Sequence, residues 1–168
     1  MTITLYYTQL SHTITQILHR AGARLEDPRL RSTAQMDGST SDQQLIRRLI
    51  KTGVAKVKLL LRDRLTDDVT EADDTLGSDT SWVFDMDITG DGQSLADLLH
   101  WFVVWLALRS VAGALGLDDM LEEAAGNAKE AEDLIKDELV QLSMPTKRHR
   151  TIAKAEDYSP IIELDSND

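Results

Sequence analysis

Hydrophobic residues recur at helical spacing in four stretches of the chain. In each stretch the apolar side chains stand three or four residues apart, which is typical of helices that bury one face. They predict helices near 9–24, 42–65, 95–115 and 118–142. The stretch between the first two, 26–41, contains Pro28, Gly38 and a Ser/Thr cluster and is predicted to be a loop.

Helix boundaries are marked by capping patterns. Ser41 with Gln44 forms a capping box before the second helix, and Ser94 with Asp97 forms a variant of it before the third. Gly116 is typical of a residue that ends a helix. We expect Asp118 to cap the fourth helix.

The third predicted helix is apolar around its whole circumference, which is typical of a helix buried on most sides. Membrane insertion is the alternative. The uninterrupted apolar run from Trp101 to Leu108 is much shorter than the roughly 18 to 20 residues that a span requires. Ionisable residues flank that run, and their burial in lipid is costly: Asp97, His100 and Arg109. We therefore predict a central core helix and expect no membrane partner.

Period-2 alternation in 82–88 predicts a half-buried strand, since Trp82, Phe84, Met86 and Ile88 alternate with other residues. At the N-terminus Ile3, Leu5 and Tyr7 alternate like a short extended arm. The acidic stretch 66–81 is predicted to be a mobile loop. The expected fold is mainly α, a compact bundle of about four helices with one short strand or hairpin and extended terminal arms. We expect one helical domain over 1–142, with its core in 41–142, and an extended C-terminal arm over 143–168.

The segment "DMDITGDG" places Asp85, Asp87 and Asp91 near positions of an EF-hand calcium loop. The register fails in both frames, because Ala96 or Leu98 stands where the closing bidentate Glu is needed. We therefore interpret the segment as strand, turn and helix start, and predict no metal site. The three aspartates are the candidate ligands should an ion bind there.

Charge and cysteine content exclude several classes of protein. The formal net charge is −11, which argues against a general nucleic-acid binder, and no sequence-specific nucleic-acid partner is expected. Cysteine is absent, so disulfides, thiolate zinc sites and a cysteine nucleophile are excluded. This composition fits an intracellular or virion setting.

The charges are segregated along the chain. Residues 42–65 carry seven Lys or Arg against two Asp, whereas 66–93 carry nine acids and no base. Opposite patches of this kind pair within one chain or between copies, or remain solvated surfaces. The candidate interface residues are Arg47, Arg48 and Lys51 on the basic side, and Asp73 and Asp74 on the acidic side.

After Pro145 the chain changes character. A basic cluster comes first, formed by Lys147, Arg148 and Arg150 around His149. We favour an acidic protein surface over nucleic acid as its partner, because the aromatic residues that stack on single strands are not interleaved with it. An acidic end then encloses an apolar group that is unusual for a solvated tail, and we predict that it binds a partner: Tyr158, Ile161, Ile162 and Leu164.

No motif for catalysis is found. The four histidines are scattered, and there is no Gly-rich phosphate loop or nucleophile elbow. We expect a non-enzymatic protein without a cofactor. The alternative enzyme hypothesis is a hydrolase that uses the acids of 66–91 with a divalent metal ion, since hard cations prefer oxygen ligands.

The order of the predicted elements resembles the tailed-phage head–tail connector, or neck adaptor, proteins. The resemblance covers about 41–142 and rests on "SDQQLIRRLIKTGVAKVKLLL", a polar loop and short strand, "LADLLHWFVVWLALRSV", and "EAEDLIKDELVQL". It implies a small helical virion subunit that forms a homo-oligomeric ring between portal and tail and is assembled in the bacterial cytoplasm. The family contributes no catalytic residue. The alternative is a calcium-responsive or acidic helical protein-interaction module of the bacterial cytoplasm.

Overall fold

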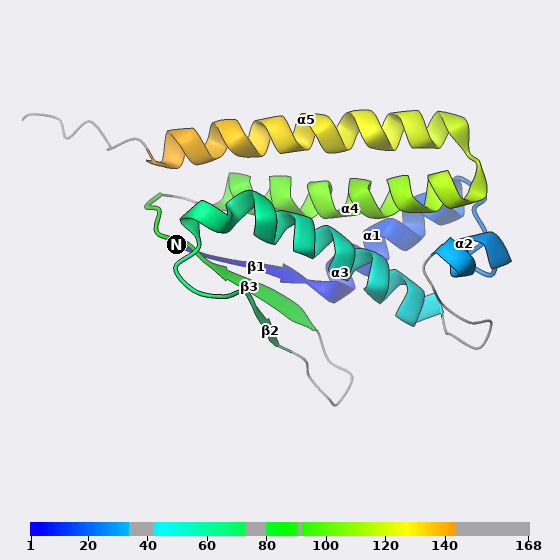
Figure 1. The fold of residues 1–168 in the computed structure, drawn as a ribbon, viewed down its shortest axis with the longest axis horizontal. Coiled ribbons are helices and arrows are strands. Elements are labelled where there is room, and N and C mark those ends of the chain that lie inside the picture. The colour runs from blue at the N-terminus through cyan, green and yellow to red at the C-terminus, as the bar shows by residue number, and fades with distance from the viewer. Residues whose placement is uncertain (34–41, 73–79, 91, 144–168) are drawn as a thin grey trace, which may run out of the picture.

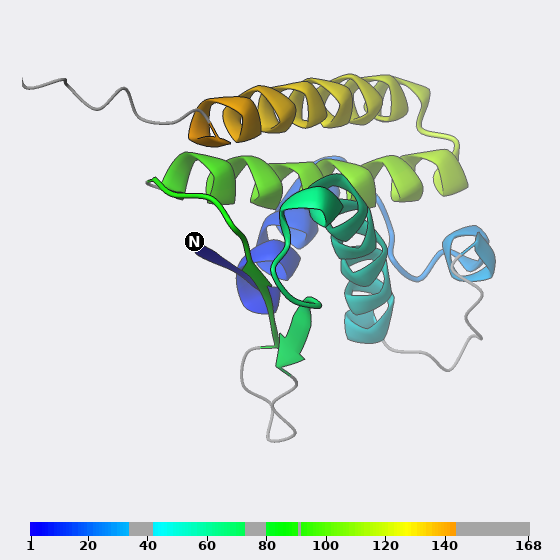
Figure 2. The same cartoon turned by 60° about the vertical axis from the view of Figure 1, so that its left-hand side comes forward.

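Helix α4, Gln93–Leu115, is the centre of the fold. In the computed structural model, which describes residues 1–33, 42–72, 80–90 and 92–143, helices and a small sheet surround it (Figures 1 and 2). Ten of its residues are buried, because α1, α2, α3, α5 and β1 all contact it. The prediction of a mainly helical fold around a buried third helix is confirmed.

Helix α5, Asp118–Ser143, runs antiparallel to α4 along its length (Figure 1). Its inner face carries the buried Ala124, Ala128 and Ala131, and small side chains let two helices approach closely. The connection turns at Gly116, whose φ of 70° is left-handed, so the predicted C-cap is confirmed. Asp118 is the first helical residue and does not cap the helix, because the Leu121 N–H donates to the Leu117 carbonyl at 2.8 Å.

The other side of α4 is covered by α1, Tyr7–Arg20, and α3, Asp42–Leu61, which continues into the short 3-10 helix η1, Arg62–Arg64. The first helix was predicted to reach residue 24. It ends at Arg20, and Gly22 then adopts a φ of 69° that turns the chain away. The capping box before α3 is not described, since Ser41 lies outside the described residues.

The predicted loop 26–41 contains a helix, α2, Pro28–Thr33, and that part of the prediction was wrong. Pro28 occupies the first helical position, where its missing N–H costs nothing. The Asp27 carboxylate accepts the Arg29 backbone N–H at 2.9 Å and caps the helix. Leu30 is fully buried and fastens the short helix to the core.

Three antiparallel strands form a sheet in the order β1-β3-β2: β1, Thr2–Tyr6; β2, Thr70–Ala72; and β3, Ser81–Asp85. Ile3 pairs with Phe84 and Leu5 with Trp82, and all four side chains are buried. The alternation predicted for 82–88 is confirmed, although the strand ends at Asp85. Two predictions are corrected: the N-terminal arm is a paired strand, and β2 lies within the predicted loop 66–81.

Helix α4 begins differently from its prediction. Gly92 is the capping residue, with no side-chain cap, and Ser94 is already helical and exposed. The Ala96 N–H donates to the Gly92 carbonyl at 2.8 Å. The predicted Ser94 N-cap was therefore wrong.

Helix α4 has the length and apolar character to cross a membrane, and no other helix of the described residues has both. Half of its most apolar window is buried inside the fold. A core helix passes the same test of length and composition, and the burial of α4 by its neighbours is that of a core helix.

Candidate functional site

Two aspartates of the calcium-like segment are described, Asp85 at the end of β3 and Asp87 just after it. The Asp85 carboxylate accepts a hydrogen bond from the Thr2 hydroxyl at 2.5 Å, across the β1–β3 pair. Asp87 is exposed, and its backbone N–H donates to the Arg64 carbonyl at 2.9 Å. Asp91 lies outside the described residues. Within the described ranges no group of three or more His, Asp or Glu residues is placed to hold a metal ion.

A basic stripe follows the outer face of α3. We use this name for four exposed cations spaced by three, seven and four residues, so that they share one helix face: Arg48, Lys51, Lys58 and Arg62. Two of the three predicted basic interface residues, Arg48 and Lys51, belong to it. Arg47 is half-buried and faces α1, where burial raises the pKa of Tyr7 and the nearby Arg47 cation opposes that rise.

An acidic stripe follows the outer face of α5. Five exposed acids share that face, at successive spacings of four, seven, three and four residues: Asp119, Glu123, Glu130, Asp133 and Asp137. The whole helix has nine acids and two lysines. Its excess of negative charge was missed by the sequence interpretation, which placed the acidic partner surface in 66–93. The signal was present as acids at helical spacing on the side of the helix opposite its buried apolar residues.

The two stripes belong to helices on different sides of α4 (Figures 1 and 2). One copy therefore presents opposite charges in two directions. Opposite surfaces of this kind steer association between molecules and fix its orientation.

Residues 42–65 and 66–93 also meet within the chain. The Lys58 ammonium donates to the Asp68 carboxylate at 2.9 Å, and this hydrogen bond lowers the pKa of Asp68. Both side chains are exposed, so the pair contributes little to stability. The predicted pairing of these two charged segments thus occurs inside one copy at this point, and pairing between copies stays a prediction.

The remaining predicted partner residues lie outside the described part of the chain. The acidic candidates Asp73 and Asp74 lie outside the described residues. So do all candidates of the C-terminal arm: Lys147, Arg148, Arg150, Tyr158, Ile161, Ile162 and Leu164.

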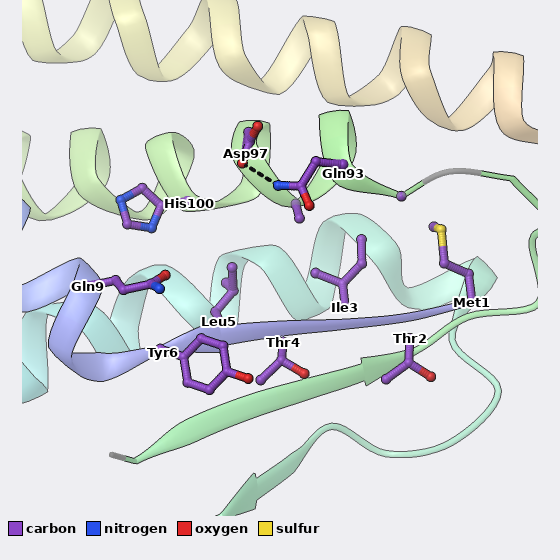
Figure 3. Close-up of a pocket in the computed structure, with 12 residues that line it drawn as sticks. Met1, Thr2, Ile3, Thr4, Leu5, Tyr6, Gln9, Gln93, Asp97 and His100 are labelled. Atoms are coloured by element: carbon purple, nitrogen blue, oxygen red, sulfur yellow. Dashed lines mark hydrogen bonds between the residues drawn. The ribbon is translucent and has the colours of Figure 1, made fainter. Parts of the chain in front are cut away.

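A groove of about 490 Å³ lies between strand β1 and the first half of α4 (Figure 3). All of β1 lines one wall, and Gln93, Asp97 and His100 line the other. The Gln93 side-chain amide donates to Asp97 at 3.0 Å. Burial lowers the pKa of His100, while the Asp97 carboxylate opposes that shift. Local sequence pattern does not predict this groove, because its two walls are about 90 residues apart in the chain.

Comparison of the chain with protein-family models, with curated proteins and with solved structures found no match.

Proposed function

We propose that the protein is a non-catalytic structural subunit that assembles head to tail with copies of itself. The supporting observation is the placement of the basic stripe of α3 and the acidic stripe of α5 on different sides of α4. In the assembly the basic stripe of one copy meets the acidic stripe of the next. Like charges then do not face each other across the contact.

The proposed contact uses two different surfaces of the subunit, so it is heterologous. Such contacts close into a ring when the rotation between neighbours divides a full turn, and otherwise form an open filament. We propose the closed ring of a tailed-phage head–tail connector, which joins a portal to a tail. The order of the helices in 41–142 supports this assignment.

A second candidate is an acidic helical module that binds a basic protein partner. The acidic stripe of α5 favours it, because opposite charges steer such encounters without any ring. Its partner is a different protein, so the two candidates differ in whether the chain associates with itself.

Charge reversal distinguishes the candidates. One variant carries Arg48→Glu with Lys51→Glu, and the other carries Glu130→Lys with Asp133→Lys. Each variant alone repels itself across the proposed contact. Mixed in equal amounts, the two pair as alternating neighbours, because every contact again joins opposite charges.

Analytical ultracentrifugation at low ionic strength measures the association, since salt screens exposed charges beyond about 10 Å at 0.1 M. We expect the unmodified chain and the equal mixture to assemble and each variant alone to sediment as a monomer. A matched control reverses two exposed cations outside both stripes, Arg20 at the end of α1 and Arg24 beyond it, and is expected to assemble.

Two results contradict the proposal. One is an unmodified chain that stays monomeric at its highest soluble concentration. The other is a pair of variants that associate as well alone as together. Electron microscopy of the assemblies is expected to show closed rings, and filaments contradict the connector assignment.

A further inference from the structure

Within the described part of the chain β1 is an edge strand, because the sheet order is β1-β3-β2 and β1 pairs there on one side. Met1 exchanges both backbone hydrogen bonds with Met86, at 2.7 and 2.8 Å, and the Tyr7 N–H donates to the Thr80 carbonyl at 2.8 Å. In an antiparallel pair the hydrogen-bonded positions alternate along each strand. Odd-numbered residues of β1 therefore bond to β3, and the amides of Thr2, Thr4 and Tyr6 point away from it.

This outward edge faces the groove. All of β1 lines the groove, and α4 forms the opposite wall (Figure 3). An edge of this kind is a template for one more strand, and main-chain hydrogen bonds supply the affinity when an extended segment adds to it. Five residues of strand span about 17 Å, which sets the length of the segment that fits.

The end of α5 lies beside one end of this groove. A Cβ on Gly90 would stand 2.7 Å from the Leu142 side chain, and a Cβ on Gly92 would meet the sulfur of Met1. Leu142 is therefore close to the loop that enters the groove wall, at the Met1 end of β1 (Figure 1). The described chain ends one residue later, at Ser143.

The sequence continues for 25 residues beyond Ser143, over 144–168, and a segment of this length is long enough to span the distance to the groove. The 14 residues from 144 to 157 span up to about 46 Å when extended, which is more than twice the length of the edge. Beyond them Ile162 and Leu164 alternate with Glu163 and Asp165, a period-2 pattern. A tether of this length also holds the segment at high effective concentration near the groove.

We propose that residues 158–164 of the same chain occupy the groove as a fourth strand on the outer edge of β1. The added strand pairs with the outward amides of Thr2, Thr4 and Tyr6 and with the outward carbonyls of Thr2 and Thr4. This inference concerns the free subunit and does not rest on the ring. The fourth strand is expected even if the protein never forms a ring. If the fourth strand is absent, the outcome of the charge-reversal experiment is unaffected.

Amide hydrogen exchange of the full chain, resolved by residue in NMR spectra, tests the pairing. We expect the Thr4 and Tyr6 amides to exchange at least about tenfold more slowly in the unmodified chain than in an Ile162→Ser, Leu164→Ser variant. The Ile3 and Leu5 amides bond to β3 in both proteins, so their unchanged protection shows that the sheet remains folded. The matched control, Ile152→Ser in the same tail, is expected to leave Thr4 protected.

Disulfide trapping identifies which segment occupies the groove. Because the sequence has no cysteine, any disulfide that forms joins the two introduced cysteines. Thr4→Cys is combined in turn with a cysteine at each position from 161 to 164. We expect one of these pairs to oxidise rapidly within a single chain. Rapid exchange of Thr4 in the unmodified chain overturns the proposal, and so does trapping found only between two chains, which assigns the edge to a second copy.

Discussion

Replacing Gly53 with alanine tests how closely α3 and α4 approach. Gly53 is buried in the middle of α3, where the two helices cross. A Cβ at this position would lie 2.9 Å from the Val103 Cγ1 atom and 3.3 Å from the Val103 Cα atom. The contact includes backbone and a stiff β-branched side chain, so neither atom moves aside freely.

Two effects of known size oppose each other in the Gly53→Ala variant. Alanine gains about 1 kcal/mol of helix propensity over glycine. Overpacking of a filled core costs about 1–3 kcal/mol. We expect the variant to lie between unchanged and about 2 kcal/mol less stable than the parent chain.

Gly126→Ala is the matched control, because it makes the same change in the interior of α5 with nothing within 4 Å of the new Cβ. It is expected to stabilise the protein by about 1 kcal/mol. The two variants should therefore differ by about 1–3 kcal/mol in unfolding free energy, measured by urea denaturation with circular dichroism.

A double-mutant cycle tests whether the loss of stability in Gly53→Ala comes from its contact with Val103. Combining Gly53→Ala with Val103→Ala removes the Cγ1 atom, which is the nearest atom to the new Cβ, so the two substitutions should couple favourably by about 0.5–3 kcal/mol. If Gly53→Ala stabilises as much as Gly126→Ala, or if the cycle shows no coupling, the close approach of α3 and α4 is refuted.

Three further predictions concern single residues. Gly116→Ala should lower the unfolding free energy by about 1–2 kcal/mol, since the φ of 70° is strained for alanine, and a denaturation curve like the parent's would contradict it. Burial lowers the pKa of His100 below 6.5, so the unfolded chain binds its proton more readily. The contribution of neutral His100 to the free energy of unfolding is therefore complete above about pH 6.5 and is lost as the pH falls below that value. Denaturation midpoints measured at several pH values should depend less on pH in the His100→Gln variant than in the parent chain. Calorimetry should detect no saturable calcium binding in the micromolar range, and saturable heat that Asp85→Ala abolishes would overturn this prediction.

The local pattern of apolar residues was sufficient to predict where the long helices lie. The apolar spacing in 42–65 and 118–142 predicted α3 and α5 to within a few residues. The end of α4 at Gly116 was also predictable, because a left-handed turn favours glycine wherever it occurs. Each of these features depends on residues within one or two helical turns.

Short elements were missed because their stability comes from elsewhere in the chain. Helix α2 has six residues, too few to be stable alone, and the burial of Leu30 against the core fastens it. Strand β2 has three residues and exists by pairing with β3. Their local sequences are typical of loops, so the local pattern predicted loops at both places.

The sequence by itself determined where the long helices lie, that α4 is the most apolar of them, and that charge is segregated along the chain. Tertiary structure decided that β1 pairs with β3 at the edge of the described sheet, with Thr2 opposite Asp85, and that β1 lies beside α4. It also decided that the basic and acidic stripes point to different sides of α4. Periodicity along the chain reports only on contacts between near neighbours. The groove and the directions of the stripes depend on contacts between residues far apart in sequence, which form only when the whole core packs.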